Sequence, residues 1–286
     1  DQTRFPFRPI RWVRIEPDEP FVFTHTHDVL ARGQIIVPFE IMDTPMTQAQ
    51  YTAAVGENHS DLPRYKPDPK QVTWRVNGQP LRLYPDRPVD EVGKDRALAL
   101  VDRINQEKAD RYHYDLPSLL EWLYVATAKG QTLFNARPWG PEPPGEVGWF
   151  HGETYSRRTV AQKKAILWGP RKEPIWDMFG NVREHVWDPC FLARRPDGPL
   201  LQTRAPAGDE RPDDQFTTIQ ANGVRFTQWS KITLLAGYGT WDLDHRECRL
   251  AMPWTGPGGK GVRLVRYRLD DLAKLPPSRP GAGGGE

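Results

Sequence analysis

The chain has 286 residues, of which 38% are hydrophobic and 27% charged, a composition typical of globular proteins with a sizeable core. Its 39 basic and 37 acidic residues give a net charge of +2, so the strong basic excess of a nucleic-acid-binding protein is excluded. The 29 prolines and 24 glycines, beside 11 tryptophans, exclude helix bundles and regular βαβ arrays and favour a loop-rich fold. No stretch is long and apolar enough to predict a transmembrane segment.

The N-terminal residues 1–30 begin with a run rich in proline, arginine and aromatic side chains, and we interpret them as an arm or an irregular edge strand. The arm can pack on its own domain or dock on a partner, and the sequence favours neither. Residues 34–41 are mostly β-branched and apolar, which predicts a buried strand. A short helix follows, which Thr44 or Thr47 can cap and Gly56 ends.

Residues 57–92 contain many turn formers and predict a long irregular excursion. A second helix is predicted over 94–108, because four apolar residues share one helical face. These residues are Ala97, Leu100, Val101 and Ile104. A third helix begins after Ser118, which forms a capping box with Glu121.

Residues 231–236 and 262–267 predict two strands. The second alternates apolar and basic residues, so we expect one of its faces to be exposed to water. Residues 271–286 are a proline- and glycine-rich tail that we expect to be disordered. No internal repeat is evident, and we expect one α+β domain over 31–270 with low secondary-structure content.

Segment 176–185, W-D-M-F-G-N-V-R-E-H, resembles the Y-D-M-x-G-N-V-W-E-W motif of the formylglycine-generating enzyme family, or sulfatase-modifying factor domain family. Further segments resemble motifs of the same family in the same order, namely 39–51, 55–60, 87–92, 114–126, 138–140, 239–241 and 261–265. The resemblance implies a C-type-lectin-like variant fold, with about three helices, a twisted antiparallel sheet and much irregular chain.

Formylglycine-generating enzymes hold copper(I) between two thiolates shortly after a G-S-W motif, because soft sulfur ligands suit this ion. The matching stretch here, 241–251, carries one cysteine, Cys248, while Leu243 or a neighbour stands at the first thiolate position. The resemblance therefore implies that formylglycine generation is not expected, and that neither copper nor iron is expected as a cofactor.

In family members the turn that 176–185 resembles binds calcium through two side chains and two main-chain carbonyls. Carried over to this sequence, the metal ligands are the side chains of Asp177 and Glu184 and the carbonyls of Gly180 and Val182. Hard oxygen atoms from one tight turn suit a structural Ca²⁺ ion. In the alternative interpretation, the two acidic residues cap the turn or form local salt bridges.

Some relatives bind their ligands with residues between the G-S-W and G-F-R motifs. The corresponding window here contains the predicted ligand-binding residues Tyr238, Trp241, Asp242, Asp244, His245, Arg246 and Trp254. Aromatic residues with adaptable polar neighbours make good contact surfaces. In the alternative interpretation, the tryptophans are core residues of a loop-rich fold.

Histidine and cysteine residues supply further candidates. Cys248 and His245 are spaced as a Cys/His nucleophile pair, or are a buried thiol and a loop histidine. His25 and His27 either share one strand face as a metal clip or lie in an exposed polar turn. His185 stands where the family has tryptophan, and we interpret it as a packed or surface histidine rather than a base.

The first residue is Asp1 rather than Met, so we expect removal of a targeting segment and export to the periplasm or the extracellular space. Cys190 and Cys248 can form a disulfide there or stay as two free thiols. We predict a non-catalytic family member that acts as a binding or scaffolding subunit with a protein partner. The alternative is a metal-dependent oxidoreductase of the same family with a remodelled active site.

Overall fold

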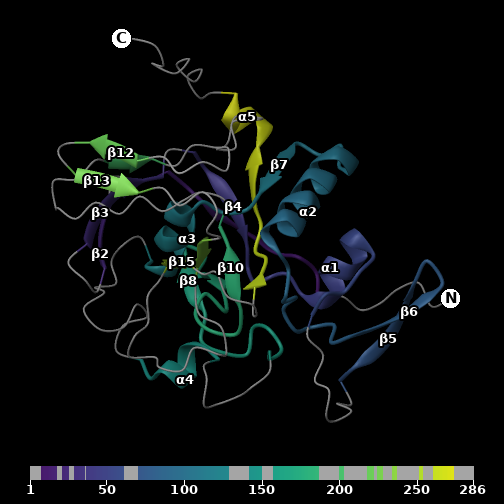
Figure 1. Cartoon of the computed structure of the whole chain (residues 1–286). Helices are drawn as coiled ribbons and strands as arrows, with labels where there is room; N and C mark the ends of the chain where they lie inside the picture. Colours follow the sequence, from purple (N-terminus) through teal and green to yellow (C-terminus); the bar gives the residue numbers. More distant parts are fainter. Residues whose placement is uncertain are drawn as a thin grey trace.

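A computed structural model describes thirteen stretches of the chain, which include nearly all of 37–128. These are residues 8–17, 21–25, 29–35, 37–60, 70–128, 142–149, 157–186, 200–202, 218–221, 224–227, 234–236, 251–253 and 260–273. The described part consists of short strands and a few helices joined by irregular segments (Figure 1). The predicted α+β class, with few helices and small antiparallel sheets, is confirmed.

The main sheet brings together segments from both ends and the middle of the chain. Its strand order is β1 (Trp12–Ile15), β4 (Phe39–Met42), β17 (Val265–Arg268), β7 (Tyr112–Asp115), and every pair is antiparallel. Because side chains alternate between faces, Val13, Ile41 and Val265 pair in one row on the same face, where all three are buried.

The remaining strands form smaller sheets. A second sheet has the order β15 (Ala251–Pro253), β14 (Leu234–Ala236), β10 (Arg183–His185), β16 (Lys260–Gly261), with β10 and β16 parallel. A third has the order β11 (Leu200–Gln202), β3 (Val29–Gln34), β2 (Phe21–His25). Three two-stranded sheets are β5 (Val72–Val76) with β6 (Gln79–Leu83), β8 (Ile166–Trp168) with β9 (Glu173–Ile175), and β12 (Thr218–Ala221) with β13 (Val224–Thr227).

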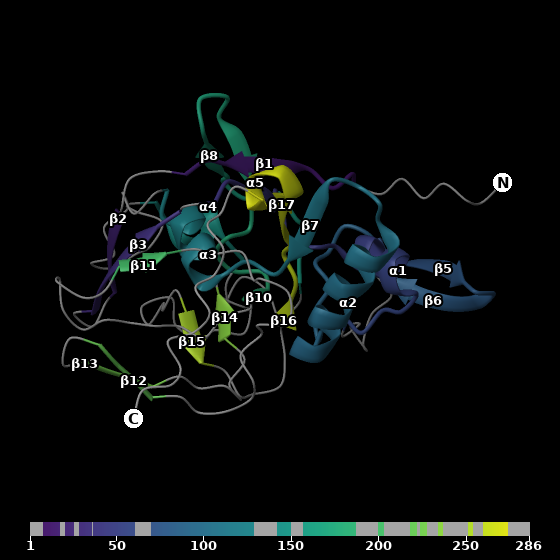
Figure 2. The ribbon, with the colours of Figure 1, turned by 90° about the horizontal axis from the view of Figure 1, so that it is seen from above.

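Helices α1 (Gln48–Val55), α2 (Lys94–Glu107) and α3 (Leu119–Ala126) confirm the three predicted helices. Two single-turn helices, α4 (Pro144–Val147) and α5 (Leu269–Leu272), complete the described set. α2 lies on one side of the main sheet and α3 on the other (Figures 1 and 2). None of the described helices has the length and apolar character needed to cross a membrane.

The capping residues that predicted the ends of these helices make the expected contacts. Thr47, not Thr44, is the N-cap of α1, and it forms a capping box with Gln50. Gly56 ends this helix with φ of 81°, in the left-handed region that glycine adopts without steric cost. At α3, the Ser118 N–H donates to the Glu121 carboxylate, and the Glu121 N–H donates to the Ser118 hydroxyl.

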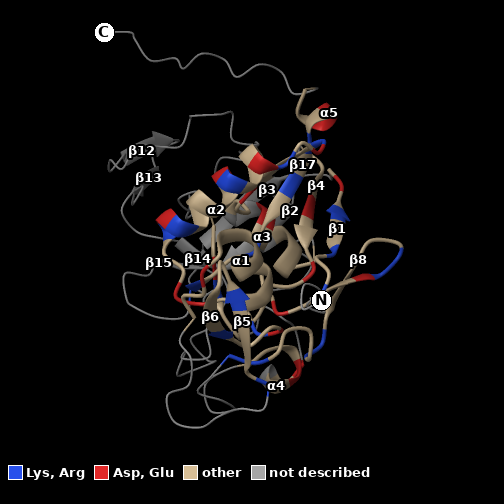
Figure 3. Cartoon of the chain, turned by 90° about the vertical axis from the view of Figure 1, so that its right-hand side faces the viewer, with Lys and Arg blue, Asp and Glu red and all other residues tan. Residues whose placement is uncertain are grey.

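Two apolar clusters lie against opposite faces of the main sheet. One contains Ile15, Phe39 and Tyr267 of the sheet with Trp122 and Tyr124 of α3. The other joins Met42 to Leu100 and Val101 of α2 and to residues beside α1. Basic and acidic residues are interspersed along the described elements (Figure 3).

Two predictions of secondary structure, one of a strand and one of an irregular segment, are wrong in detail. The strand predicted over 34–41 is interrupted, since β3 ends at Gln34 and β4 begins at Phe39, after Pro38, which has no N–H for a ladder. The predicted irregular excursion 57–92 contains the β5–β6 hairpin, whose turn is Asn77-Gly78 with φ of 50° and 80°. An Asn-Gly pair between two strand-forming runs is a strong hairpin signal that the sequence interpretation missed.

Residues 8–17 of the predicted arm pack on their own domain. The Arg8 guanidinium bonds the Asp43 carboxylate at 2.7 Å and lies 5.1 Å from the centre of the Trp176 ring, and Gln50 donates to the Arg8 carbonyl. β1 is an edge strand of the main sheet, so the domain begins before residue 31. At the other end, α5 extends to Leu272, and residues 274–286 of the predicted tail lie outside the described part.

Candidate functional site

Many of the predicted ligand-binding and catalytic residues lie outside the described part of the chain. These are Tyr238, Trp241, Asp242, Asp244, His245, Arg246 and Trp254, together with Cys190, Cys248 and His27. His25 is the last residue of β2, paired with Val29, and its side chain is not among those described. The contact surface, the thiol chemistry and the histidine clip therefore stay predictions.

Three of the four predicted metal ligands, Asp177, Gly180 and Val182, lie on one buried turn that joins β9 to β10, and Glu184 follows in β10. Asp177, Gly180 and Asn181 have φ of 54°, 74° and 59°, so the turn is built from left-handed residues. The buried Asn181 side chain accepts from the Arg158 N–H and donates to the Arg158 carbonyl, while the Asn181 N–H donates to the Trp149 carbonyl. These bonds fix the turn against residues 149 and 158.

Asp177 is buried, and one of its two carboxylate oxygens is hydrogen-bonded. Its Oδ2 accepts the Ala161 N–H at 2.7 Å, whereas Oδ1 has no hydrogen-bond partner among the described atoms. Burial raises the pKa of Asp177 to about 6, against the opposing effects of the Ala161 N–H and the Arg263 charge. Calcium binding at Asp177, Gly180, Val182 and Glu184 stays a prediction that these contacts do not test.

Glu184 is the centre of a buried polar cluster. Its carboxylate binds the Arg263 guanidinium at 2.9 Å and accepts the Trp122 indole N–H at 2.7 Å. Arg263 also donates to the carbonyls of Met42 and Trp176, at 2.9 and 2.8 Å. This cluster, here called the Arg263 tie, joins β10, α3 and the ends of β4 and β9 to the segment before β17.

The sequence interpretation was wrong about Arg263. The apolar–basic alternation of 262–267 predicted a face exposed to water, but Arg263 is 0% exposed. Its acidic partner lies 79 residues earlier in the chain, so no local pattern could reveal the pair. The motif match over 261–265 was the available signal, because it singled out this arginine together with the turn of Glu184.

His185 is packed in the interior, which is one of the two positions, packed or at the surface, that the sequence left open. Its ring Nε2 lies 2.7 Å from the Val92 carbonyl, which accepts a hydrogen bond from it, and its Nδ1 has no partner among the described atoms. Burial, with smaller effects of Lys94 and Lys260, lowers the pKa of His185 to about 4. The imidazole is therefore neutral at neutral pH.

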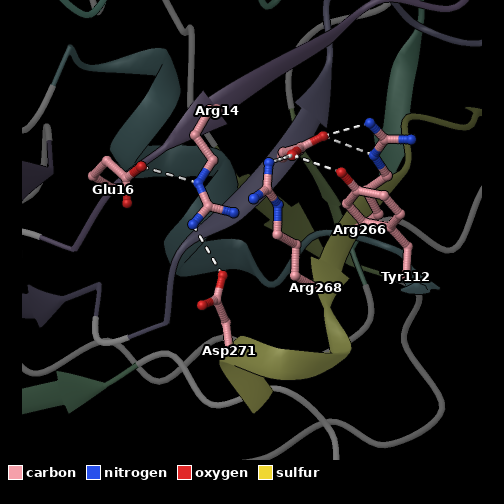
Figure 4. Close-up of polar contacts among 7 residues, drawn as sticks. Arg14, Glu16, Tyr112, Arg266, Arg268 and Asp271 are labelled. Atoms are coloured by element: carbon pink, nitrogen blue, oxygen red, sulfur yellow. Dashed lines mark hydrogen bonds and ion pairs between the residues drawn. The ribbon is translucent and has the colours of Figure 1, made fainter. Parts of the chain in front are cut away.

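A second acid–arginine cluster lies on the other face of the main sheet. Glu40 accepts two bonds from Arg266 and one from the Tyr112 hydroxyl, and it lies 3.6 Å from Arg268. The Arg266 guanidinium stacks between the rings of Tyr112 and Trp12, at 3.9 and 4.4 Å. Figure 4 shows Arg266, Arg268 and Tyr112 pointing toward one carboxylate.

Arg14 lies beside this cluster and forms its own ion pairs with Glu16 and Asp271 (Figure 4). In both clusters, each acid is surrounded by donors of the same chain. Paired in this way, Glu40 and Glu184 tie segments of the chain together.

Comparison with known proteins agrees with this architecture. The family model of the sulfatase-modifying factor enzyme 1-like domain matches residues 21–195, more than half of the chain. The chain belongs to the sulfatase-modifying factor family. This confirms the resemblance found in the motifs, and with it the predicted fold.

Solved structures of this fold are similar over almost the whole chain. Treponema denticola variable protein 1 superposes with a TM-score of 0.59 at 15% identity, covering 91% of this chain and 95% of its own. PvdO from Pseudomonas aeruginosa gives 0.56 at 16% identity, covering 90% and 94%. CarF gives 0.51 at 18% identity, covering 91% and 98%. A search of curated protein sequences gave no match.

Removing the charge of Glu184 should be far more damaging than removing that of a surface glutamate. Glu184→Gln leaves Arg263 buried without its anion, and we expect it to lower the free energy of unfolding by about 3 to 5 kcal/mol. Glu107→Gln, which breaks the exposed pair with Arg103, is the control and should change it by less than about 0.5 kcal/mol. Urea unfolding measures both, and equal effects would contradict the structural role of the Arg263 tie.

The turn should accept no side chain at Gly180. A Cβ there would lie 2.5 Å from the Trp149 carbonyl oxygen, so we expect Gly180→Ala to cost about 3 kcal/mol or more in unfolding free energy. Gly78→Ala is the matched control, because Gly78 has a similar φ of 80° but open space around it, and should cost about 1 kcal/mol. Thermal unfolding of the two variants compares the costs, and a smaller loss for Gly180→Ala would show that the turn can relax.

The lowered pKa of His185 predicts a pH-dependent loss of stability. The unfolded chain binds a proton on this histidine below its ordinary pKa of about 6.5, whereas the folded protein does so only near 4. Stability is therefore lost as the pH falls from 6.5 toward 4, by about 2 kcal/mol at pH 5 from this residue alone. We expect His185→Gln to lose about that much less stability than the wild type between pH 7 and pH 5 in urea titrations, and an equal loss would refute the assignment.

Proposed function

We propose that this protein is a non-catalytic, exported member of the sulfatase-modifying factor family that acts as a binding or scaffolding subunit of a larger assembly. The observation that carries the proposal is the single cysteine, Cys248, in the stretch 241–251, where the family's copper chemistry requires two thiolates. One thiolate cannot provide the linear site that copper(I) takes between two sulfur ligands.

The polar groups of the described interior support the same proposal. Glu184 is bound by Arg263 and Trp122, and Glu121 accepts the Tyr267 hydroxyl at 2.8 Å while capping α3. An acid or base in catalysis must be free to exchange a proton with the substrate. These acids instead hold secondary structure elements in place, which is what a binding scaffold requires of its interior.

The proposed contact surface is the segment 238–254, with Tyr238, Trp241 and Trp254 as its aromatic anchors. Aromatic anchors bury large areas with little loss of conformational entropy, and neighbouring Asp and Arg side chains add specificity. The proposed partner is a protein of the compartment to which the chain is exported.

A second candidate is a metal-dependent oxidoreductase with a remodelled site. His245 lies three residues before Cys248, and this spacing can bring an imidazole and a thiolate to one metal ion. The His25 and His27 pair is a further source of imidazole ligands for this candidate.

Metal analysis separates the two candidates. We expect protein purified without chelator to contain neither copper nor iron in stoichiometric amount. Stoichiometric copper or iron that is lost in Cys248→Ser or His245→Ala, but kept in Cys190→Ser as the matched thiol control, would replace the binding proposal with the oxidoreductase.

Cross-linking in the native cell envelope, followed by affinity purification, tests for the partner. We expect a specific protein partner that Tyr238→Ala and Trp241→Ala release, and that Arg75→Ala on the exposed face of the β5–β6 hairpin retains. A monodisperse monomer with no cross-linked partner would argue against the scaffold.

A further inference from the structure

The calcium ion implied by the family resemblance needs oxygen atoms that have free lone pairs. An ionised carboxylate offers about four lone-pair positions, two on each oxygen. At Glu184 they are met by three N–H groups, one of which, the Arg263 Nε–H, is shared between the two oxygens. Oε2 accepts from Trp122 Nε1 at 2.7 Å and from Arg263 Nε at 2.9 Å, while Oε1 accepts from Arg263 Nε at 3.1 Å and Nη2 at 2.9 Å.

The other implied ligands are partly engaged as well. The Gly180 carbonyl accepts the Val182 N–H at 2.7 Å, and Asp177 Oδ2 accepts the Ala161 N–H at 2.7 Å. Asp177 Oδ1 is the one carboxylate oxygen of the implied set without a partner. No group of three or more His, Cys, Asp or Glu side chains in the described stretches is arranged to hold a metal ion.

The Arg263 guanidinium already makes the connections that a cation would make here. It contacts four oxygen atoms, both of Glu184 and the carbonyls of Met42 and Trp176, and it is 0% exposed. Calcium needs six to eight oxygen ligands, and a calcium ion that took both Glu184 oxygens would have to displace this guanidinium. The displaced arginine would then be buried without its anion, which is strongly destabilising.

The residues present therefore do not fit the implied metal. We infer that the Arg263 guanidinium occupies the Glu184 carboxylate, so that the 176–185 turn binds no calcium and the protein is equally stable with and without it. The planar guanidinium suits this role because its donors form a fixed fork that matches a carboxylate and two carbonyls at once.

Calcium titration of the full chain, freed of metal by chelation and dialysis, tests the inference. We expect no saturable heat of binding in calorimetry and the same thermal midpoint in excess calcium, in excess magnesium and in EDTA. A saturable calcium site that raises the midpoint and is lost in Asp177→Asn would overturn the inference. Binding that Asp177→Asn leaves intact would lie at another site and would support it.

A substitution of Arg263 tests whether its guanidinium stabilises the turn. Lysine keeps the charge but cannot reach four oxygen atoms in one plane. We expect Arg263→Lys to lower the thermal midpoint and calcium not to restore it, whereas Arg103→Lys in the exposed pair with Glu107 should leave the midpoint unchanged. Restoration of the Arg263→Lys midpoint by calcium would show that the ion and the guanidinium are interchangeable and would contradict the exclusion. Should Arg263→Lys fail to fold, the titration of the unaltered protein decides the question.

Discussion

The fold depends on one buried charge being paired. Arg263 is 0% exposed, and a guanidinium in that environment is tolerated only if its anion and its hydrogen-bond acceptors are in place. Its acceptors come from β10, from the end of β4 and from Trp176, and these segments lie far apart in the sequence. Main-chain bonds reinforce the arrangement, since the Met42 N–H donates to the Leu264 carbonyl and the Trp176 N–H to the Asp43 carbonyl. Any rearrangement that separates these segments leaves a charge unpaired in the interior, so the pairing selects one arrangement of an otherwise loop-rich chain.

Helix α3 is attached to both sheets through two consecutive side chains. Glu121 caps the helix and accepts the Tyr267 hydroxyl of β17, while Trp122 donates to Glu184 of β10. Because the strands of these two sheets are only two to four residues long, their ladder hydrogen bonds connect few segments, and bonds between side chains supplement them. The turn at Asn181 works in the same way, because its amide holds Arg158 on both backbone groups. This explains how a sequence so rich in proline and glycine keeps a defined interior.

The sequence predicted the parts of this structure whose causes are local. The capping boxes at Thr47 and Ser118, and the apolar face of α2, lie within a few residues of the elements that they define. The alternation of residues 262–267 predicted a face exposed to water, and this was wrong at Arg263. A charged side chain is buried only where a partner is available, and the partner of Arg263 lies far away in the sequence. For the candidate site, the motifs located the Asp177–Glu184 turn, but the occupancy of the Glu184 oxygens could not be read from them. The missed β5–β6 hairpin was an error of another kind, because its Asn77-Gly78 turn is a local signal that the sequence contained.

On each face of the main sheet, a glutamate is paired with an arginine. On one side Glu184 is neutralised by Arg263, and on the other Glu40 is neutralised by Arg266, whose guanidinium is held between two aromatic rings. Both arginines come from one short segment, Gly261 to Arg268, so this segment supplies the cations for both faces. Each acid is held by its arginine, and the two ion pairs connect segments that lie far apart in the sequence. The proposed recognition of a partner therefore requires no change to these two ion pairs of the interior.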